Sequence, residues 1–283
     1  MDIPLSTPIL MDGATGTALR QRGMPEEACT EEWILRHPQE LLALQRAYVA
    51  AGAGVLTAPT FGANPASLAR FGLEEATEDF NRRLVALSRE ASGGKAKVAG
   101  NLAPCGMGEF AVREGRFEEV VDNYRAQVSA LAAAGVDLYV VETMLDMAEA
   151  RAAVLAIGEA DPGKPVIVTF CCDGEGRTPA GVDVLAALIV MQGMGVSAFG
   201  LNCAAPEVVE EQLERLAPYA CVPLAAQPSG DGETAASFAR RAEGYARLGV
   251  RVFGGCCGTT PETISELRRA VDGQHLGPFA PME

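Results

Sequence analysis

Three cysteines at the ends of apolar segments could hold a metal ion. Cys256 and Cys257 lie in the glycine-rich turn 254–261, directly after the strand-like segment 250–253, and Cys203 ends a similar segment. Neighbouring residues of a regular strand point to opposite faces, so both vicinal thiols reach one ion only if the chain bends, which glycines permit. Three protein ligands with an exchangeable fourth position are typical of catalytic zinc, and soft sulfur ligands favour zinc over magnesium. The pattern therefore predicts a zinc site.

Other uses of these thiols must be weighed beside the metal site. Cys256 and Cys257 could be small residues in a tight loop, or they could form a vicinal disulfide. A second pair, Cys171 and Cys172, also follows a strand-like segment and is the rival source of ligands. Burial is its expected role, because one ion with an open position rarely needs four or five sulfurs. The chain has two histidines, which gives little support to a histidine-based metal site or a Ser-His-Asp triad.

Two acids, Asp12 and Glu142, directly follow strand-like segments. Buried carboxylates are costly unless they are paired, so a cationic group such as an α-ammonium would suit them. The backbone N–H groups of Gly13 and Ala14 could bind a carboxylate, as turns with successive amides do. Asp12 could instead cap the turn that follows it, and a hydrogen bond to a neighbouring loop is an equal alternative for Glu142.

Composition sets broad limits on the class of protein. Hydrophobic residues make up 48% of the 283 residues and charged residues 21%, which is typical of a globular chain. The net charge of −14 argues against a nucleic-acid groove or an anionic membrane surface. No secretory signal is visible and no apolar run reaches the ~18–20 residues that span a bilayer. We expect a cytoplasmic protein, in which eight cysteines do not form a disulfide framework.

Apolar strand-like segments alternate with amphipathic helical ones along the whole chain. We expect eight strands, at 9–11, 55–58, 96–100, 137–142, 166–170, 198–202, 222–226 and 250–253. Helices are expected near 38–51, up to 91, and over 117–134, 147–159, 183–192, 206–217, 234–248 and 260–271. Eight such units predict an α/β fold, a single-domain (β/α)8 TIM barrel over residues 1–283. An open doubly wound sheet is the alternative, but segment 12–17 lacks the G-x-G-x-x-G pattern that usually accompanies it.

In such a barrel the carboxyl ends of the strands form the active-site face. The predicted ligands follow strands six and eight, and the two acids follow strands one and four. The barrel would therefore bring these residues to one rim.

Five segments together resemble the zinc-dependent homocysteine S-methyltransferase family. They are 10–17, 57–64, 142–143, 200–203 and 254–261, in the order of the family and over nearly the whole chain. This is the homocysteine-binding barrel found in cobalamin-dependent methionine synthase and betaine–homocysteine methyltransferase. The first and last segments are most similar to the methionine synthase branch.

The resemblance implies a function for each predicted site residue. Cys203, Cys256 and Cys257 would be the Zn²⁺ ligands. Asp12 and Glu142 would hold the amino group of L-homocysteine, and the amides of Gly13 and Ala14 its carboxylate. The implied reaction is methyl transfer from a donor to the homocysteine thiolate, which forms methionine. Beyond activation of the substrate thiol by zinc, no further catalytic residue is implied.

The chain departs from the family pattern near strand seven. Segment 226–230 lacks an asparagine that can occupy the vacant zinc position in the methionine synthase branch. A resting zinc would then need water, Gln227 or Ser229 as its fourth ligand.

The methyl donor is the second point that the resemblance leaves open. The chain ends after the eighth helix, so we expect the donor to be a free small molecule such as S-methylmethionine, or a separate methylated corrinoid protein. Two alternatives are a methyltransferase acting on a different thiol and a non-catalytic partner of a corrinoid protein. No nucleic-acid or membrane partner is expected.

Overall fold

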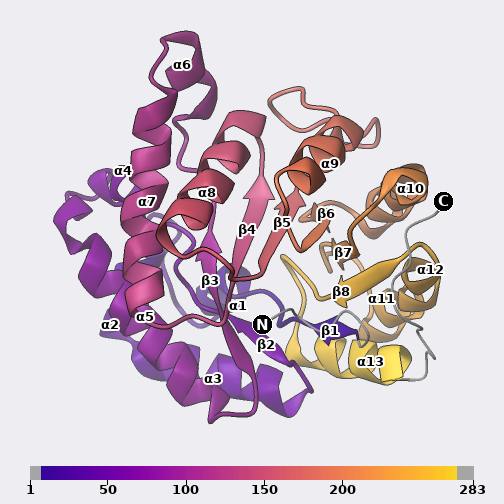
Figure 1. Ribbon diagram of the computed structural model, residues 1–283. Coiled ribbons are helices and arrows are strands. Elements are labelled where there is room, and N and C mark those ends of the chain that lie inside the picture. The colour runs from indigo at the N-terminus through magenta and orange to yellow at the C-terminus, as the bar shows by residue number, and fades with distance from the viewer. Residues whose placement is uncertain (1–7, 273–283) are drawn as a thin grey trace.

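Eight parallel strands form the centre of the molecule (Figure 1). The computed structural model describes residues 8–272, so the ends of the predicted domain 1–283 lie outside the described residues. Each strand pairs with its neighbours in the order β1-β8-β7-β6-β5-β4-β3-β2. The strands are β1 (Ile9–Leu10), β2 (Val55–Thr57), β3 (Lys97–Leu102), β4 (Leu138–Met144), β5 (Val166–Phe170), β6 (Ala198–Asn202), β7 (Leu224–Gln227) and β8 (Val250–Phe253).

The sheet closes between β1 and β2, beyond the end of β1. Met11 forms an isolated parallel bridge with Val55. The N–H of Asp12 donates to the carbonyl of Val55 at 3.1 Å, and the N–H of Gly54 donates to the carbonyl of Leu10 at 2.8 Å. These contacts join the two ends of the sheet. The expected (β/α)8 barrel is confirmed, and the doubly wound alternative is wrong.

Helices surround the strands on the outside (Figure 1). The long ones lie where the sequence predicts them: α3 (Pro38–Ala50), α5 (Thr77–Ser92), α7 (Phe117–Ala133), α8 (Met147–Ala160), α9 (Val184–Gly193), α10 (Pro206–Leu216) and α13 (Pro261–Asp272). Short elements not predicted occupy the loops: α1 (Gly16–Gln21), α2 (Thr30–Arg36), α4 (Pro65–Ala69), α6 (Gly108–Arg113), and the 3-10 turns η1 (Glu74–Ala76) and η2 (Ala217–Tyr219). No helix among the described residues is long and apolar enough to cross a membrane.

The helix predicted over 234–248 is divided at Arg241. It forms α11 (Ala235–Arg240) and α12 (Ala242–Arg247), and Arg241 itself keeps a right-handed conformation, with φ −69° and ψ −22°. Its N–H donates to the carbonyl of Phe238, three residues back. One tightened turn therefore interrupts an otherwise continuous helix.

Side chains on the strands alternate between two apolar layers. One set fills the barrel interior, among them Met11, Val140, Ile167 and Val252, and the other packs beneath the helices. A strand buried on both faces needs apolar residues at successive positions, which explains the continuous β-branched segments of the sequence. Burial of each large aliphatic side chain contributes about 1.5–3 kcal/mol.

Gly200 has a steric role in this barrel. A Cβ atom there would overlap the carbonyl oxygen of Ala225 in the paired strand β7. Glycine at this position therefore permits β6 and β7 to lie at their observed separation. It lies three residues before Cys203 in the chain.

Candidate metal and substrate site

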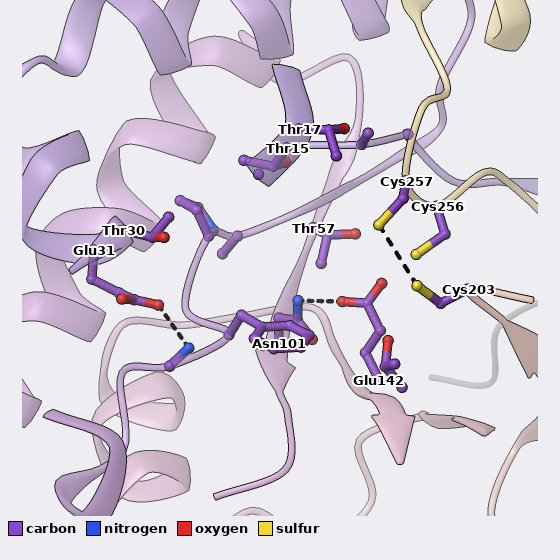
Figure 2. A pocket seen from close by; sticks show the side chains of 18 of the residues that line it. Thr15, Thr17, Thr30, Glu31, Thr57, Asn101, Glu142, Cys203, Cys256 and Cys257 are labelled. Atoms are coloured by element: carbon purple, nitrogen blue, oxygen red, sulfur yellow. Dashed lines mark hydrogen bonds between the residues drawn. The ribbon is translucent and has the colours of Figure 1, made fainter. Parts of the chain in front are cut away.

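Three cysteine sulfurs meet at the carboxyl end of the barrel (Figure 2). The Sγ atoms of Cys203, Cys256 and Cys257 all lie within 4.8 Å of one another, and those of Cys203 and Cys257 are 3.6 Å apart. All three cysteines are free and partly exposed. Among the described residues this is the one group of three or more potential ligands with metal-binding spacing. The structure therefore brings the three predicted ligands together.

Unusual backbone conformations aim two side chains at this end of the barrel. Cys203 has φ 56° and Thr143 has φ 54°, and these are the non-glycine residues with positive φ in the described part of the chain. Such conformations cost free energy for residues with a Cβ, and they persist where the surroundings impose them. The turn after β8 is held by Thr259, whose Oγ1 donates to the carbonyl of Cys256 at 2.7 Å.

The three thiols of the cluster differ in pKa. Hydrogen bonds from Cys203 and Cys256 lower the pKa of Cys257 to about 3, and the positive charge of Arg20 acts in the same direction. The hydrogen bond with Cys256 lowers the pKa of Cys203, but its hydrogen bond with Cys257 and burial outweigh this and raise the value to about 12. Hydrogen bonds with the other two thiols, and burial, raise the pKa of Cys256. Without a cation, the cluster thus favours a single thiolate.

Asp12 is held by strand β2. It is 2% exposed, and its two carboxylate oxygens accept from the backbone N–H of Thr57 at 2.9 Å and from the Thr57 hydroxyl at 2.8 Å. Burial raises the pKa of Asp12 to about 7, although the hydrogen bonds from Thr57 oppose the shift. The carboxylate does not cap the turn that follows it, since α1 begins after Thr15.

Glu142 faces the cavity with one oxygen engaged. Its Oε2 accepts from the side-chain amide of Asn101 at 2.6 Å, while the Oδ1 of Asn101 is buried without a hydrogen-bond partner. Burial raises the pKa of Glu142 and the Asn101 hydrogen bond lowers it, while the charge of Cys257 raises it further. Glu142 and Asn101 both line the cavity, and the second oxygen of the Glu142 carboxylate has no hydrogen-bond partner among the described residues and can accept from a ligand there.

The loop 13–14 lies on the same cavity, but one of its amides is already used. The N–H of Ala14 donates to Thr259 Oγ1 at 3.1 Å, and the carbonyl of Ala14 accepts from the Tyr48 hydroxyl at 2.9 Å. A Cβ on Gly13 would come within 2.9 Å of the Tyr48 oxygen, so the loop packs tightly there. A ligand carboxylate would have to displace the Thr259 contact to reach the Ala14 amide.

One cavity of about 460 Å³ connects these groups. Asp12, Glu142 and the three cysteines line it together with Glu31 and Arg70, and the exposed rings of Phe61 and Phe71 mark its outer part. In Figure 2 Glu31 stands on the opposite side of the pocket from the cysteines. The volume is sufficient for a small organic ligand with room beyond it.

Glu31 is a cavity residue that the sequence pattern did not reveal. It is 6% exposed, accepts from the N–H of Gly62 at 2.6 Å and from the thiol of Cys29 at 3.5 Å, and burial raises its pKa. An acid in the first turn of a helix is ordinarily a partner of the helix dipole, so nothing local marks it as buried.

The rival pair Cys171 and Cys172 does not join the sulfur cluster. The Cys171 thiol donates to the carbonyl of Cys203 at 3.6 Å, and Cys172 is 6% exposed. Of the two suggested fourth ligands, Gln227 lines the cavity with an unpartnered buried Oε1. Ser229 instead donates to Asp231 at 2.9 Å.

Comparison with known proteins identifies this combination of barrel and site. Residues 9–271 match the model of the homocysteine S-methyltransferase family. The chain belongs to this family. The homocysteine methyltransferase MmuM from Escherichia coli, in its metallated form, superposes with a TM-score of 0.80 at 27% identity, covering 93% of this chain and 96% of that one.

Two curated relatives are methionine synthases. The protein from Mycobacterium leprae is 30% identical over 92% of this chain, and that from Mycobacterium tuberculosis is 29% identical over 96%. This chain spans about a quarter of the length of either relative, 24% and 25% respectively.

Proposed function

We propose that this protein is a zinc-dependent methyltransferase that moves a methyl group from a donor to the thiolate of L-homocysteine and so forms methionine. The meeting of Cys203, Cys256 and Cys257 beside the carboxylate of Glu142, in one cavity, is the observation that supports it most. Family membership supports the same reaction class.

The sulfur geometry fits a tetrahedral zinc ion. With Zn–S bonds of about 2.3 Å, two thiolates of a tetrahedral site stand about 3.8 Å apart. The Cys203–Cys257 separation of 3.6 Å is close to that value, and the third sulfur is within 4.8 Å of both. Three soft ligands, with no histidine in the cluster among residues 8–272, favour zinc over the metals that prefer oxygen. When bound, zinc would hold the substrate sulfur as a thiolate at neutral pH.

The chain's own residues would bind and orient the amino acid. The α-ammonium group suits the second oxygen of Glu142 and the unpartnered Oδ1 of Asn101. Asp12 would attract the ammonium group through its charge without contacting it directly, because both its oxygens already accept from Thr57. The substrate carboxylate would lie against the loop at Gly13 and Ala14. Fixing both ends of the ligand restricts its thiol to one position relative to the incoming methyl carbon.

The outer part of the cavity would admit the methyl donor. A methylated corrinoid on a separate protein and a small molecule such as S-methylmethionine both fit the proposal. The three cysteines must stay reduced to act as ligands, which agrees with a cytoplasmic location.

Metal analysis combined with a single substitution tests the proposal. Cys256→Ser is expected to reduce zinc from one ion per chain to a small fraction and to abolish methionine formation, since a serine hydroxyl is a poor zinc ligand. Cys221→Ser is the matched control, because Cys221 is exposed and outside the cluster. Assays with homocysteine and, in turn, methylcobalamin, S-methylmethionine, betaine and methylfolate identify the donor. Zinc-free protein that still methylates homocysteine would refute the mechanism.

A further inference from the structure

Asn202 is a fully buried amide at the end of β6, directly before Cys203. Its Nδ2 donates to the hydroxyl of Thr143 at 2.6 Å and to the Sγ of Cys256 at 3.8 Å. Among the described side chains, it is the one whose N–H group donates to a sulfur of the cluster. The Oδ1 of Asn202 is buried without a hydrogen-bond partner.

The orientation of this amide follows from the chemistry of its neighbour. A cysteine that binds a metal is a thiolate, which accepts hydrogen bonds and donates none. An amide oxygen facing it would be repelled, so the NH₂ group must face Cys256. The hydroxyl of Thr143 accepts from the same NH₂ group at 2.6 Å. The amide thus has one orientation that satisfies both contacts.

The proposed reaction poses a problem of selectivity among sulfur atoms. Three cysteine thiolates and the substrate thiolate would share one site, and any of them could attack an electrophilic methyl group. Attack by a cysteine would form an S–CH₃ bond while the methyl–donor bond breaks, and the leaving group would depart with the electron pair. The resulting thioether is a weak acceptor and a poor ligand, so the site would be inactivated.

We propose that Asn202 is a positioning residue that protects Cys256 from methylation, by donating a hydrogen bond to its sulfur and so making that sulfur a weaker nucleophile than the substrate sulfur. The inference rests on the function proposed above. A hydrogen bond to a ligand sulfur withdraws electron density from it and fixes its direction. A lone pair that accepts an N–H is also less accessible to a methyl carbon.

Methyl iodide is a direct probe of this protection. Zinc-loaded protein without homocysteine is treated with methyl iodide, and each cysteine peptide is quantified by mass spectrometry. We expect Asn202→Ala to increase methylation of Cys256 by about tenfold and to weaken zinc binding by about 10–100-fold, as loss of a hydrogen bond to a ligand does. Asn81→Ala is the matched control: Asn81 is also fully buried, donates twice through Nδ2 and has an unpartnered Oδ1, but its partners are the carbonyls of Ala63 and Thr77.

A measurement on the unaltered protein covers the case in which Asn202→Ala fails to fold. With ¹¹³Cd in place of zinc, a hydrogen bond between the Asn202 amide and Cys256 should give scalar coupling between cadmium and a side-chain amide proton of Asn202. Bound cadmium without this coupling, or equal methylation of Cys256 in Asn202→Ala and in the unaltered protein, would overturn the inference. Failure to bind one cadmium per chain would instead refute the proposed metal site.

Discussion

Asp12→Asn is expected to stabilise the protein, increasingly so as the pH rises. Asp12 is buried, and its carboxylate accepts twice from Thr57. An asparagine has nearly the same shape. Its Oδ1 can accept from the backbone N–H of Thr57, and its NH₂ can donate to the Thr57 hydroxyl. Both contacts therefore survive, while the cost of burying a charge disappears.

The magnitude follows from the pKa of Asp12, which rises from an ordinary 3.8 to about 7 in the folded chain. Between these values the folded protein binds more protons than the unfolded one, so its stability falls as the pH rises. By proton linkage the charged carboxylate costs about 4 kcal/mol at pH 8 but only about 2 kcal/mol at pH 5. The stability gap between Asp12→Asn and the unaltered protein should therefore widen by roughly 2 kcal/mol over this range.

Urea denaturation of metal-free protein at pH 5, 6, 7 and 8 measures this gap. Asp137→Asn is the control: the Arg89 guanidinium and the Val98 N–H hold the pKa of Asp137 below its usual range, against the effect of burial. Stability supplied by Asp137 is present above its ordinary pKa, so its variant should lose a constant amount from pH 5 to 8. A pH-independent gap for Asp12→Asn would refute the reasoning. If the variant also binds homocysteine more weakly, stability has been exchanged for function at this site.

Three further substitutions test other parts of the structure. Glu142→Gln should raise the KM for homocysteine by at least about tenfold, since it removes the charge that we propose to face the substrate ammonium, and an unchanged KM in a steady-state assay would exclude that role. Gly200→Ala should lose about 3 kcal/mol or more in urea denaturation because its methyl group overlaps the Ala225 carbonyl; a loss below 1 kcal/mol would contradict the packing. Arg241→Met removes ion pairs to three glutamates, two in α10 and one, Glu233, shortly before α11. It should cost about 1–2 kcal/mol, less in 1 M salt, and a salt-independent loss would show that packing dominates.

The periodic parts of the fold could be predicted from sequence. Strands β5, β6 and β8 have the predicted bounds, because each is a continuous apolar run with a clear change of composition at both ends. Helix α13 begins at Pro261, and Thr260 accepts from the N–H of Thr263, as its capping signal indicates. The short helices α1, α2, α4 and α6 were not predicted, because five to seven residues are too few to show a helical period.

The candidate site was predictable where it depends on the order of strands. Cysteines after strands six and eight must meet in a closed barrel, and they do. The contacts that the segment after β1 makes with its neighbours were not predictable. The engagement of Asp12 by Thr57, and of the Ala14 amide by Thr259, joins residues that are far apart in the chain. No local pattern encodes such pairs, because they depend on how β1 approaches both β2 and β8 in the closed barrel.

The closure of the barrel between β1 and β2 also governs the order in which the protein can assemble on the ribosome. Strand β1 is made first, and its contacts with β2 at Gly54 and Val55 can form early, but its pairing with β8 cannot form until residue 253 has emerged. Cys256 and Cys257 emerge only a few residues later. A nascent chain can therefore form most of the sheet while two of its three proposed metal ligands, Cys256 and Cys257, are still missing. Ring closure and the complete set of three proposed ligands are therefore reached at nearly the same moment of synthesis.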